Sequence, residues 1–211
     1  MGQIIDLRSS RRLAPTAESN KIRRGGRRPN KEMRAREHLT PSEVEQLLNA
    51  AAKGRHGQRD RTLLLLMYRH GLRVSEAVNL RWDQFDLKAG LLHVGRLKHG
   101  VPSTHPVRGP ELRALGRLKR DFPKSPYVFI SQRGGPMTSN NAREIVFRAG
   151  KAAGFSFRVH PHQLRHACGF KLANEGVDTR ALGHYLGHRN LNNTAIYAEL
   201  VPDRFKNFWQ D

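Results

Sequence analysis

The chain is poor in cysteine and acidic residues, and it has no long apolar run. Its 211 residues include a single cysteine, Cys168, which excludes an internal disulfide framework and a zinc site built from several thiolates. No stretch of 18 apolar residues occurs, and neither a secretory apolar region nor a lipidation signal is recognisable. We therefore expect a soluble, cytoplasmic protein.

Acidic side chains are outnumbered by basic ones along the whole sequence. There are 18 Asp and Glu against 38 Lys and Arg, which gives a formal net charge of +20. Residues 1–39 hold 11 of the basic and 4 of the acidic residues, so the remainder of the chain is basic as well. This excess predicts a polyanionic partner. Nucleic acid is favoured, and an acidic membrane surface is the alternative.

Two parts are predicted along the chain. Residues 1–39 contain few aliphatic side chains, and we interpret them as a basic flexible arm that orders on DNA. A solvated tail without a role is the alternative. The arm holds a cluster of arginines that we expect to contact DNA: Arg23, Arg24, Arg27 and Arg28. Residues 40–211 are predicted to form one folded domain, because the chain is 37% hydrophobic and long enough to bury a core.

Helical periodicity dominates this domain. Thr-Pro-Ser-Glu at 40–43 is a capping box with proline at the first helical position. Further helices are expected at 58–70, 74–80, 109–121, 139–153, 162–175, 179–187 and 191–199. Residues 91–94 and 103–107 predict a β-hairpin, and 127–130 a short strand. The predicted fold class is mainly α with a small antiparallel β-sheet.

Six side chains together predict phosphodiester chemistry without a metal ion. They are Arg73, Lys98, His162, Arg165, His188 and Tyr197. The two arginines would neutralise a pentacoordinate phosphorane, and the phenol would be the nucleophile. An unperturbed phenol has a pKa of about 10, so it needs a base or a positive field at neutral pH. His162 is the acid/base candidate, Lys98 would protonate the departing 5′-oxygen, and His188 would bind the scissile phosphate.

Several of these residues also have a plainer interpretation. Arg73, taken alone, would cap a helix or pair with Glu76, and Lys98 alone would be a surface lysine. Tyr185 is an alternative nucleophile, although a buried aromatic is favoured there. Arg96 is interpreted as a phosphate contact or a surface charge. The histidines expected to be polar or DNA-facing are His99, His105 and His160.

Histidine pairs at i, i+4 raise the alternative of zinc. His162 with His166 and His184 with His188 have this spacing, but neither pair encloses the glutamate of the metalloprotease pattern. His166 is interpreted instead as a packed or hydrogen-bonded helix residue. Gly169, inside the same predicted helix, indicates close helix packing.

Taken together, the six residues resemble the catalytic domain of the tyrosine recombinases, also called the phage integrase family. That family has Arg within Gly-Leu-Arg-x-Ser-Glu, a hairpin Lys, His-x-x-Arg, Leu-Gly-His, and Tyr nine residues later. This chain matches at Arg73, Lys98, His162, Arg165, His188 and Tyr197. The resemblance implies the family's helical catalytic fold, a covalent 3′-phosphotyrosyl intermediate and strand exchange through a Holliday junction. It also implies that the reaction needs no metal, ATP or other cofactor.

Within that family the chain resembles the small fimbrial phase-switch invertases of bacteria over about residues 37–209. The segments that carry this resemblance are 96–98, 104–106, 160–162, 164–170 and 185–190. Most family members have a helical core-binding domain ahead of the catalytic part, whereas here the basic arm occupies that place, as in the fimbrial type. The implied partner is double-stranded DNA at specific sites, bound by a homotetramer on paired sites, with a DNA-bending accessory protein, in the nucleoid. The aromatic residues of the tail pack either on a neighbouring subunit or on their own core: Phe205, Phe208 and Trp209.

Three functions remain open from the sequence. The first is a site-specific DNA recombinase, which would invert, integrate or excise DNA. The second is a DNA-binding regulator that kept the fold and lost the reaction, although binding alone needs no phenol at position 197. The third is DNA relaxation of the type IB topoisomerase kind, which shares the chemistry.

Overall fold

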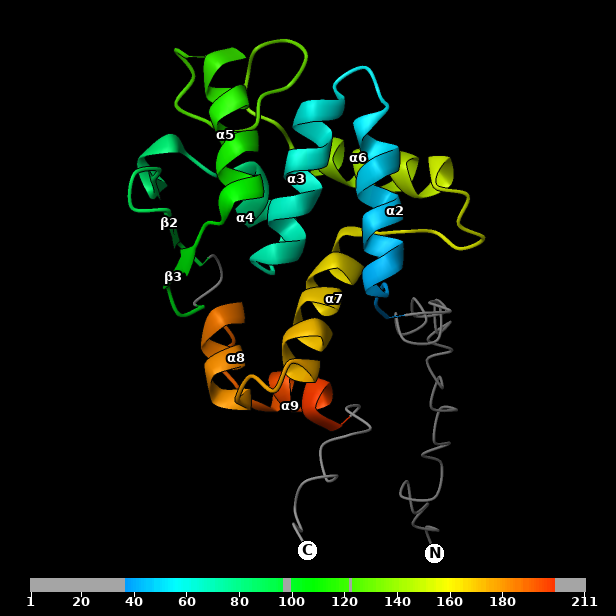
Figure 1. Cartoon of the computed structure of the whole chain (residues 1–211), viewed down its shortest axis with the longest axis vertical. Coiled ribbons are helices and arrows are strands. Elements are labelled where there is room, and N and C mark those ends of the chain that lie inside the picture. The colour runs from blue at the N-terminus through cyan, green and yellow to red at the C-terminus, as the bar shows by residue number, and fades with distance from the viewer. Residues whose placement is uncertain (1–36, 97–99, 122, 200–211) are drawn as a thin grey trace, which may run out of the picture. The chain divides into compact units, whose positions relative to one another are not determined.

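The computed structural model describes residues 37–96, 100–121 and 123–199, and this part is mainly helical, as predicted (Figure 1). The helices are α2 (Pro41–Ala52), α3 (Gly57–Arg69), α4 (Val74–Val78), α5 (Gly109–Asp121), α6 (Ser139–Ala152), α7 (Pro161–Asn174), α8 (Thr179–Leu186) and α9 (Asn192–Glu199). A short 3-10 helix, η1 (Trp82–Gln84), precedes three strands: β1 (Phe85–Asp86), β2 (Leu91–Val94) and β3 (Ser103–Pro106).

Side-chain caps fix where several helices begin. Thr40 and Glu43 form the predicted capping box of α2: the Thr40 amide donates to the Glu43 carboxylate at 2.8 Å, and the Glu43 amide donates to the Thr40 hydroxyl at 3.3 Å. Before α8, the Asp178 carboxylate accepts hydrogen bonds from the amides of Arg180 and Ala181, each at 2.9 Å. These caps satisfy amides that a helix leaves without a partner in its first turn.

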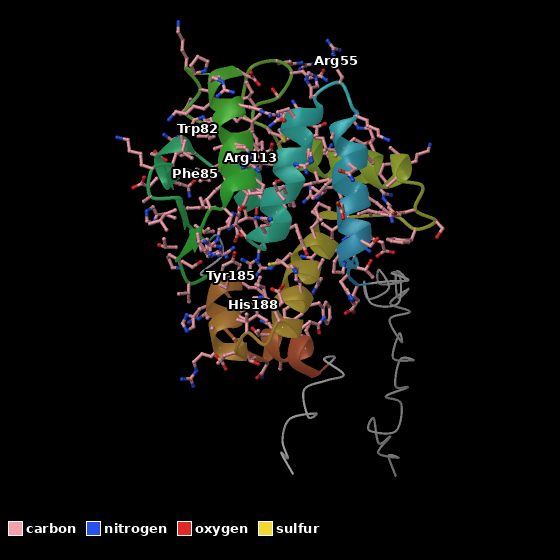
Figure 2. All side chains as sticks on the ribbon, in the orientation of Figure 1. Arg55, Trp82, Phe85, Arg113, Tyr185 and His188 are labelled. Carbon is pink, nitrogen blue, oxygen red and sulfur yellow. The ribbon has the colours of Figure 1, made fainter. Side chains whose placement is uncertain are left out.

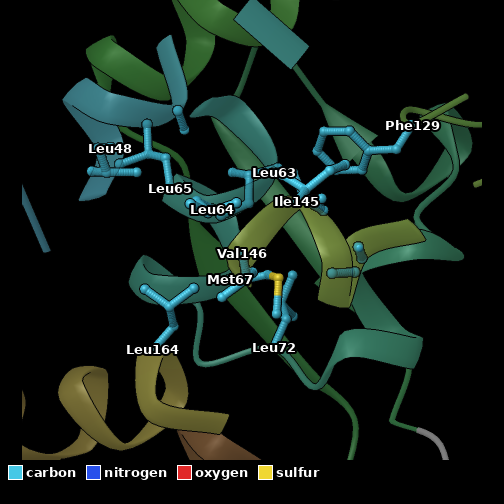
Figure 3. Packing of buried hydrophobic residues seen from close by; sticks show 14 of the residues in the cluster. Leu48, Leu63, Leu64, Leu65, Met67, Leu72, Phe129, Ile145, Val146 and Leu164 are labelled. Carbon is cyan, nitrogen blue, oxygen red and sulfur yellow. The ribbon is translucent and has the colours of Figure 1, made fainter. Parts of the chain in front are cut away.

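Helix α3 is the centre of the main hydrophobic core. Its run from Leu63 to Met67 is buried at every position, which is expected only of a helix surrounded by protein on all sides. Helices α2, α5, α6 and α7 pack around it, and Figure 3 shows Leu63, Leu64 and Met67 among residues of the other helices. The core therefore fixes the position of α3, which precedes Arg73, relative to α7, which carries His162 and Arg165.

The three strands form an antiparallel sheet in the order β1-β2-β3. Leu92 pairs with His105, and Val94 pairs with Ser103, so the predicted hairpin is confirmed. Leu92 and Val94 are buried and the alternate position His93 is exposed, which is the period-2 pattern of a sheet with one covered face. Residues 97–99, between β2 and β3 in the sequence, lie outside the described part.

The predicted strand at 127–130 is wrong. Tyr127 forms a single bridge with Arg81, and Ile130 forms another with Pro136, so two different segments each supply one partner. Neither segment continues alongside for a second bridged pair. The stretch is instead a connection with bends at Val128 and Phe129, and it places Phe129 in the core.

A second, smaller hydrophobic cluster forms where α7, α8 and α9 meet. Its buried members are Cys168, Phe170, Leu182, Leu186 and Tyr197. The end of the chain that carries the predicted nucleophile is therefore folded against the helix that carries Arg165. Within the described part, no helix combines the length and apolarity needed to cross a lipid bilayer. The domain boundary predicted between residues 39 and 40 stays a prediction.

Candidate active site

Arg73 begins helix α4 and is held by a carboxylate of the same helix. The Glu76 carboxylate accepts from the Arg73 backbone amide at 2.9 Å and from its guanidinium at 2.8 Å. Glu76 is 1% exposed in its side chain, whereas Arg73 is 30% exposed. Burial raises the pKa of Glu76, but the Arg73 hydrogen bonds and the charge of Arg96 outweigh it and lower that pKa below its ordinary value. The carboxylate is therefore ionised and orients a partly exposed arginine.

Arg165 lies inside α7 and is 1% exposed. Its guanidinium donates to the backbone carbonyl of Gly71, two residues before Arg73, and to that of Leu186 at 2.6 Å. Burial lowers the pKa of Arg165 to about 10, helped by the positive charges of Arg73 and Arg96. It remains protonated at neutral pH, and its two carbonyl bonds join the Arg73 turn to the loop that follows α8.

His188 stands in that loop, one residue after Gly187. Gly187 adopts the left-handed conformation, with φ 67°, that ends α8. The His188 Nδ1 lies 2.7 Å from the Thr194 hydroxyl of α9, and Thr194 is buried. Burial lowers the pKa of His188 to about 4, with further lowering by Arg165 and Arg73, so the imidazole is neutral at pH 7. Figure 2 shows His188 beside α8, with Tyr185 nearby.

Tyr197 of α9 is 1% exposed and packs flat against α7. A Cβ at Gly169 would lie 2.6 Å from the Tyr197 Cζ, so only glycine admits the ring this closely. The phenolic oxygen lies 3.0 Å from His166 Nδ1, and the ring is nearly parallel to that of His188, with centroids 6.4 Å apart. Burial raises the pKa of Tyr197 to about 12, although Arg165 opposes the rise.

A surface pocket of about 700 Å³ opens beside these residues. Arg73 and His188 line it, together with Gly100, Gly187, Arg189, Asn190, Leu191 and Asn193. A pocket with a cationic guanidinium and a neutral imidazole in its wall fits a phosphate group. Tyr197 is not among the lining residues, so its hydroxyl must move from its buried position to meet a group bound there.

Comparisons with known proteins identify the family. Residues 37–204 match the phage integrase family. The chain belongs to that family, whose members are the tyrosine recombinases. It is 42% identical over 179 residues to the Type 1 fimbriae regulatory protein FimB of Escherichia coli K12, covering 82% of this chain and 90% of FimB. Identity to FimE of the same strain is 39% over 184 residues, covering 84% and 93%. The tyrosine recombinase XerC of Oceanobacillus iheyensis is 35% identical over 158 residues, covering 71% of this chain and 52% of XerC.

Solved structures of tyrosine recombinases share the fold. The XerA recombinase superposes with a TM-score of 0.71 at 24% identity, covering 81% of this chain and 63% of XerA. The XerH site-specific recombinase bound to difH substrate, in a pre-cleavage complex, superposes with a TM-score of 0.66 at 22% identity, covering 83% and 53%. The predicted fold class, the predicted family and the enzyme class, site-specific recombinase, are confirmed by the family match and these similarities.

The fold brings four of the six family residues together: Arg73, Arg165, His188 and Tyr197. The fifth, His162, is exposed at the start of α7, and its ring meets that of His166 edge-on with centroids 4.6 Å apart. Lys98 lies outside the described residues, and so do the predicted DNA contacts His99, Arg23, Arg24, Arg27 and Arg28. Within the described ranges, no group of three His, Cys, Asp or Glu side chains could hold a metal ion.

Two interpretations of single residues are corrected. Arg96 is not a surface charge: its side chain is buried, pairs with Glu76 at 2.9 Å and donates to the Tyr185 carbonyl. Its predicted contact with DNA stays a prediction. His105 is not DNA-facing, because its side chain is fully buried. Its Nδ1 lies 3.2 Å from the Nδ1 of His70, and its ring stacks on that of Tyr185. Burial lowers the pKa of His105 to about 3. Both residues lie in segments of the sheet that fold back onto α8.

The interpretation of His166 as a packed or hydrogen-bonded helix residue is confirmed. The partners of Thr194 and His166 in the site were not predicted from the sequence. Thr194, which holds His188, stands three residues before Tyr197 and so shares its side of α9. His166 stands three residues before Gly169, on the side of α7 against which the Tyr197 ring lies. The glycine inside a helical pattern was the signal for that second contact, although the sequence did not reveal which side chain packs on it.

Proposed function

We propose that this pocket binds one backbone phosphate of double-stranded DNA and that Tyr197 attacks it. The reaction would cleave one strand, leave a covalent 3′-phosphotyrosyl intermediate and release a 5′-hydroxyl that can rejoin another strand. The observation that supports this most directly is the convergence of Arg73, Arg165 and His188 beside the Tyr197 ring. The XerH complex with its substrate, named above, supports DNA as the partner.

The two arginines would stabilise the extra negative charge of the pentacoordinate phosphorane. Arg73 lines the pocket and is fixed by Glu76, so its guanidinium is pre-oriented before the charge develops. Arg165 is fixed by two backbone carbonyls and lies close enough to Tyr197 to lower the pKa of its phenol against the effect of burial. Both would act in the transition state more than in binding.

His188 would donate a hydrogen bond to the same phosphate. With the Thr194 hydroxyl donating to Nδ1, the neutral imidazole carries its proton on Nε2, the nitrogen left for a ligand. The lowered pKa keeps this neutral form dominant down to about pH 4. His162 would serve as acid or base, and Lys98 would protonate the leaving 5′-oxygen, as the family resemblance implies.

Inversion of a DNA segment is the outcome that we propose for this recombinase. Its support is the 42% identity to FimB over nearly the whole of FimB, together with the resemblance to fimbrial invertases. The chain would act as a homotetramer on two paired sites in the cytoplasm, associated with the bacterial nucleoid, with a DNA-bending accessory protein. A plasmid with two inverted target sites tests this outcome: inverted product supports it, and relaxed plasmid alone would indicate a topoisomerase.

The nucleophile is tested with a nicked duplex that loses a short 5′-fragment after cleavage, so that the covalent adduct accumulates. Wild-type protein should form an adduct that denaturing gel electrophoresis resolves, and Tyr197→Phe should form none, because the ring remains but the hydroxyl is gone. DNA binding by gel shift should be nearly unchanged in this variant. An adduct that persists in Tyr197→Phe would refute the assignment, and Tyr185→Phe serves as the matched control that should keep the adduct.

A further inference from the structure

The Tyr197 hydroxyl has a specific partner that the family pattern does not include. Its oxygen lies 3.0 Å from His166 Nδ1, and the ring centroids of the two residues are 5.8 Å apart. His166 stands one helical turn before Gly169, where the phenol ring lies against the α7 backbone. Because the ring is held between Gly169 and Phe170, the hydroxyl is directed along α7 towards His166.

The buried position of Tyr197 makes a proton acceptor necessary. A phenol with a pKa of about 12 is ionised in only about one molecule in 10⁵ at pH 7, a hundredfold less than an unperturbed phenol. The Arg165 and Arg73 charges already favour the phenolate, yet the pKa remains raised. A base at hydrogen-bond distance removes the need for free phenolate, since it takes the proton while the new bond forms.

We propose that His166 is a further catalytic residue, whose Nδ1 receives the phenolic proton of Tyr197 as that oxygen attacks the phosphate. This inference rests on the proposed function, because it presupposes that Tyr197 is the nucleophile. In the reactive tautomer the His166 proton is on Nε2, so Nδ1 accepts from the phenol. The transfer requires that the Tyr197 hydroxyl reach the phosphate while this hydrogen bond is kept.

The step balances as a transesterification. The Oη–H bond of Tyr197 breaks and an Nδ1–H bond forms on His166, while the Oη–P bond forms and the bond from phosphorus to the 5′-oxygen breaks. The 5′-oxygen leaves as a hydroxyl after it takes a proton from the general acid of the proposed function. In the rejoining step His166 returns its proton to Tyr197, so no external oxidant, reductant or metal enters.

His162 is the other histidine to which the proton could pass, and its placement differs. It is exposed, whereas the hydrogen-bonded partner of the buried hydroxyl is His166. The two imidazoles meet edge-on at 4.6 Å between centroids, one turn apart on α7. His162 therefore lies beside His166 and can influence its charge, whereas His166 itself is hydrogen-bonded to the attacking oxygen of Tyr197.

Several ionisable groups face His166 and Tyr197 from the elements packed around them. His162 faces them from α7 itself, and His188 from the loop between α8 and α9. The charge of Glu37, in the segment before α2, raises the pKa of Tyr197, whereas Arg165 of α7 and Arg73 lower it. Neutral His188, held by Thr194, remains neutral across the range in which imidazoles usually titrate.

His166→Asn is the variant that tests the proposal. The asparagine amide oxygen can occupy the position of Nδ1 and accept the phenolic hydrogen bond, but it is not a base at any relevant pH. We expect adduct formation on the nicked duplex, in single turnover at saturating protein, to slow by about 10²–10⁴-fold. We expect the wild-type rate to fall towards acidic pH as the proton acceptor is protonated, and this acidic limb of the rate–pH profile should be absent from His166→Asn. His184→Asn, an exposed histidine of α8, is the control and should retain this limb, while His162→Asn reports whether the second histidine of α7 contributes to it.

A more acidic phenol at position 197 gives a second test of proton transfer. If His166 only packed against Tyr197, the acidity of the phenol would not restore the rate that His166→Asn has lost. Fluorotyrosine placed at position 197 ionises more easily, so it should restore part of the rate that His166→Asn has lost. It should not restore the rate of Arg165→Ala, whose defect is in charge stabilisation. Circular dichroism and gel shift identify variants that fold and bind DNA. If His166→Asn is unfolded, the rates of the fluorotyrosine variants are compared between wild type and His166→Gln instead.

The outcomes separate the two proposals. An unchanged or faster rate in folded His166→Asn, or an acidic limb retained there and lost in His162→Asn, would overturn the role of His166. It would leave Tyr197 as the nucleophile. An adduct in Tyr197→Phe would instead overturn the proposed function itself, whatever His166→Asn shows.

Discussion

At the scale of single residues, the position of the nucleophile depends on the absence of a side chain. The Tyr197 ring lies on Gly169, where the nearest ring atoms would be 2.6–2.8 Å from an added Cβ, well inside van der Waals contact. The contact occurs where α9 crosses α7, and it determines which way the hydroxyl points. A methyl group there would displace the ring or separate the two helices.

Gly169→Ala should therefore destabilise the protein by about 1–3 kcal/mol, the usual cost of overpacking a buried contact. It should also slow adduct formation, since the hydroxyl would no longer meet His166. Urea denaturation and the nicked-duplex assay measure the two effects. Gly116→Ala in α5 is the control: the nearest atom to its added Cβ is an Arg120 nitrogen at 4.0 Å, so higher helix propensity should stabilise it by up to ~1 kcal/mol. Equal behaviour of the two variants would contradict the packing argument.

The sequence predicted the identity of the site residues better than their environments. The patterns around Arg73, Arg165, His188 and Tyr197 are short, and each residue type follows from the chemistry of a phosphate ester. Whether such a side chain is exposed depends on tertiary packing, which local patterns do not encode. For that reason Arg96, which has the same side chain as Arg73, was interpreted as a surface charge although it is buried.

At the scale of elements, Arg96 joins three segments that approach the pocket. It follows β2, pairs with Glu76 of α4 and donates to the Tyr185 carbonyl of α8. An added Cβ at Gly187 would meet the Arg96 side chain at 2.6–2.8 Å, so the turn after α8 lies directly on this guanidinium. The buried pair thus connects the sheet to the turns that present Arg73 and His188.

Arg96→Met should cost about 3–5 kcal/mol of folding free energy, because it leaves the Glu76 carboxylate buried with only Arg73 as a partner. A double-mutant cycle with Glu76→Gln, followed by urea denaturation, separates the pair interaction from the loss of packing. The double variant should be less destabilised than the sum of the two single variants. Additive losses would mean that the ion pair contributes nothing beyond side-chain packing.

The sequence predicted the longer helices and the hairpin from apolar positions, capping residues and glycine stops, whereas α4, with five residues, is too short to show a repeat. Residues 127–130 have the composition of a strand but find partners in two separate segments, and a sequence pattern within one stretch contains no information about its partners. The 3-10 helix Trp82–Gln84 and the two-residue strand β1 are too short to show a repeat of apolar positions, so the sequence did not predict them.

At the scale of the whole molecule, a net charge of +20 accompanies a buried and a half-buried histidine that both remain neutral. His105 has a pKa of about 3 and His188 a pKa of about 4, both lowered first by burial. His105 is further repelled by His70 and Arg96, and His188 by Arg165 and Arg73. In the unfolded chain the same imidazoles would titrate near pH ~6.5. As the pH falls, proton binding by these two histidines in the unfolded chain therefore favours unfolding at a higher pH than protonation of the carboxylates does.

The sign of this dependence follows from proton binding. Between about pH 6 and pH 4 the unfolded chain binds two more protons than the folded one, so the free energy of unfolding falls as pH decreases, by up to ~2.7 kcal/mol per pH unit. The contribution of the two histidines is fully present above pH ~6.5 and is lost progressively towards their folded pKa values. Urea midpoints at pH 7.5, 6 and 5 measure this loss. His188→Asn, which can keep the Thr194 bond and cannot titrate, should show a slope lower by ~1.4 kcal/mol per pH unit. A midpoint that does not change between pH 7.5 and 5 would mean that folding does not lower the pKa of either imidazole, so that His188 would be neutral only above pH ~6.5.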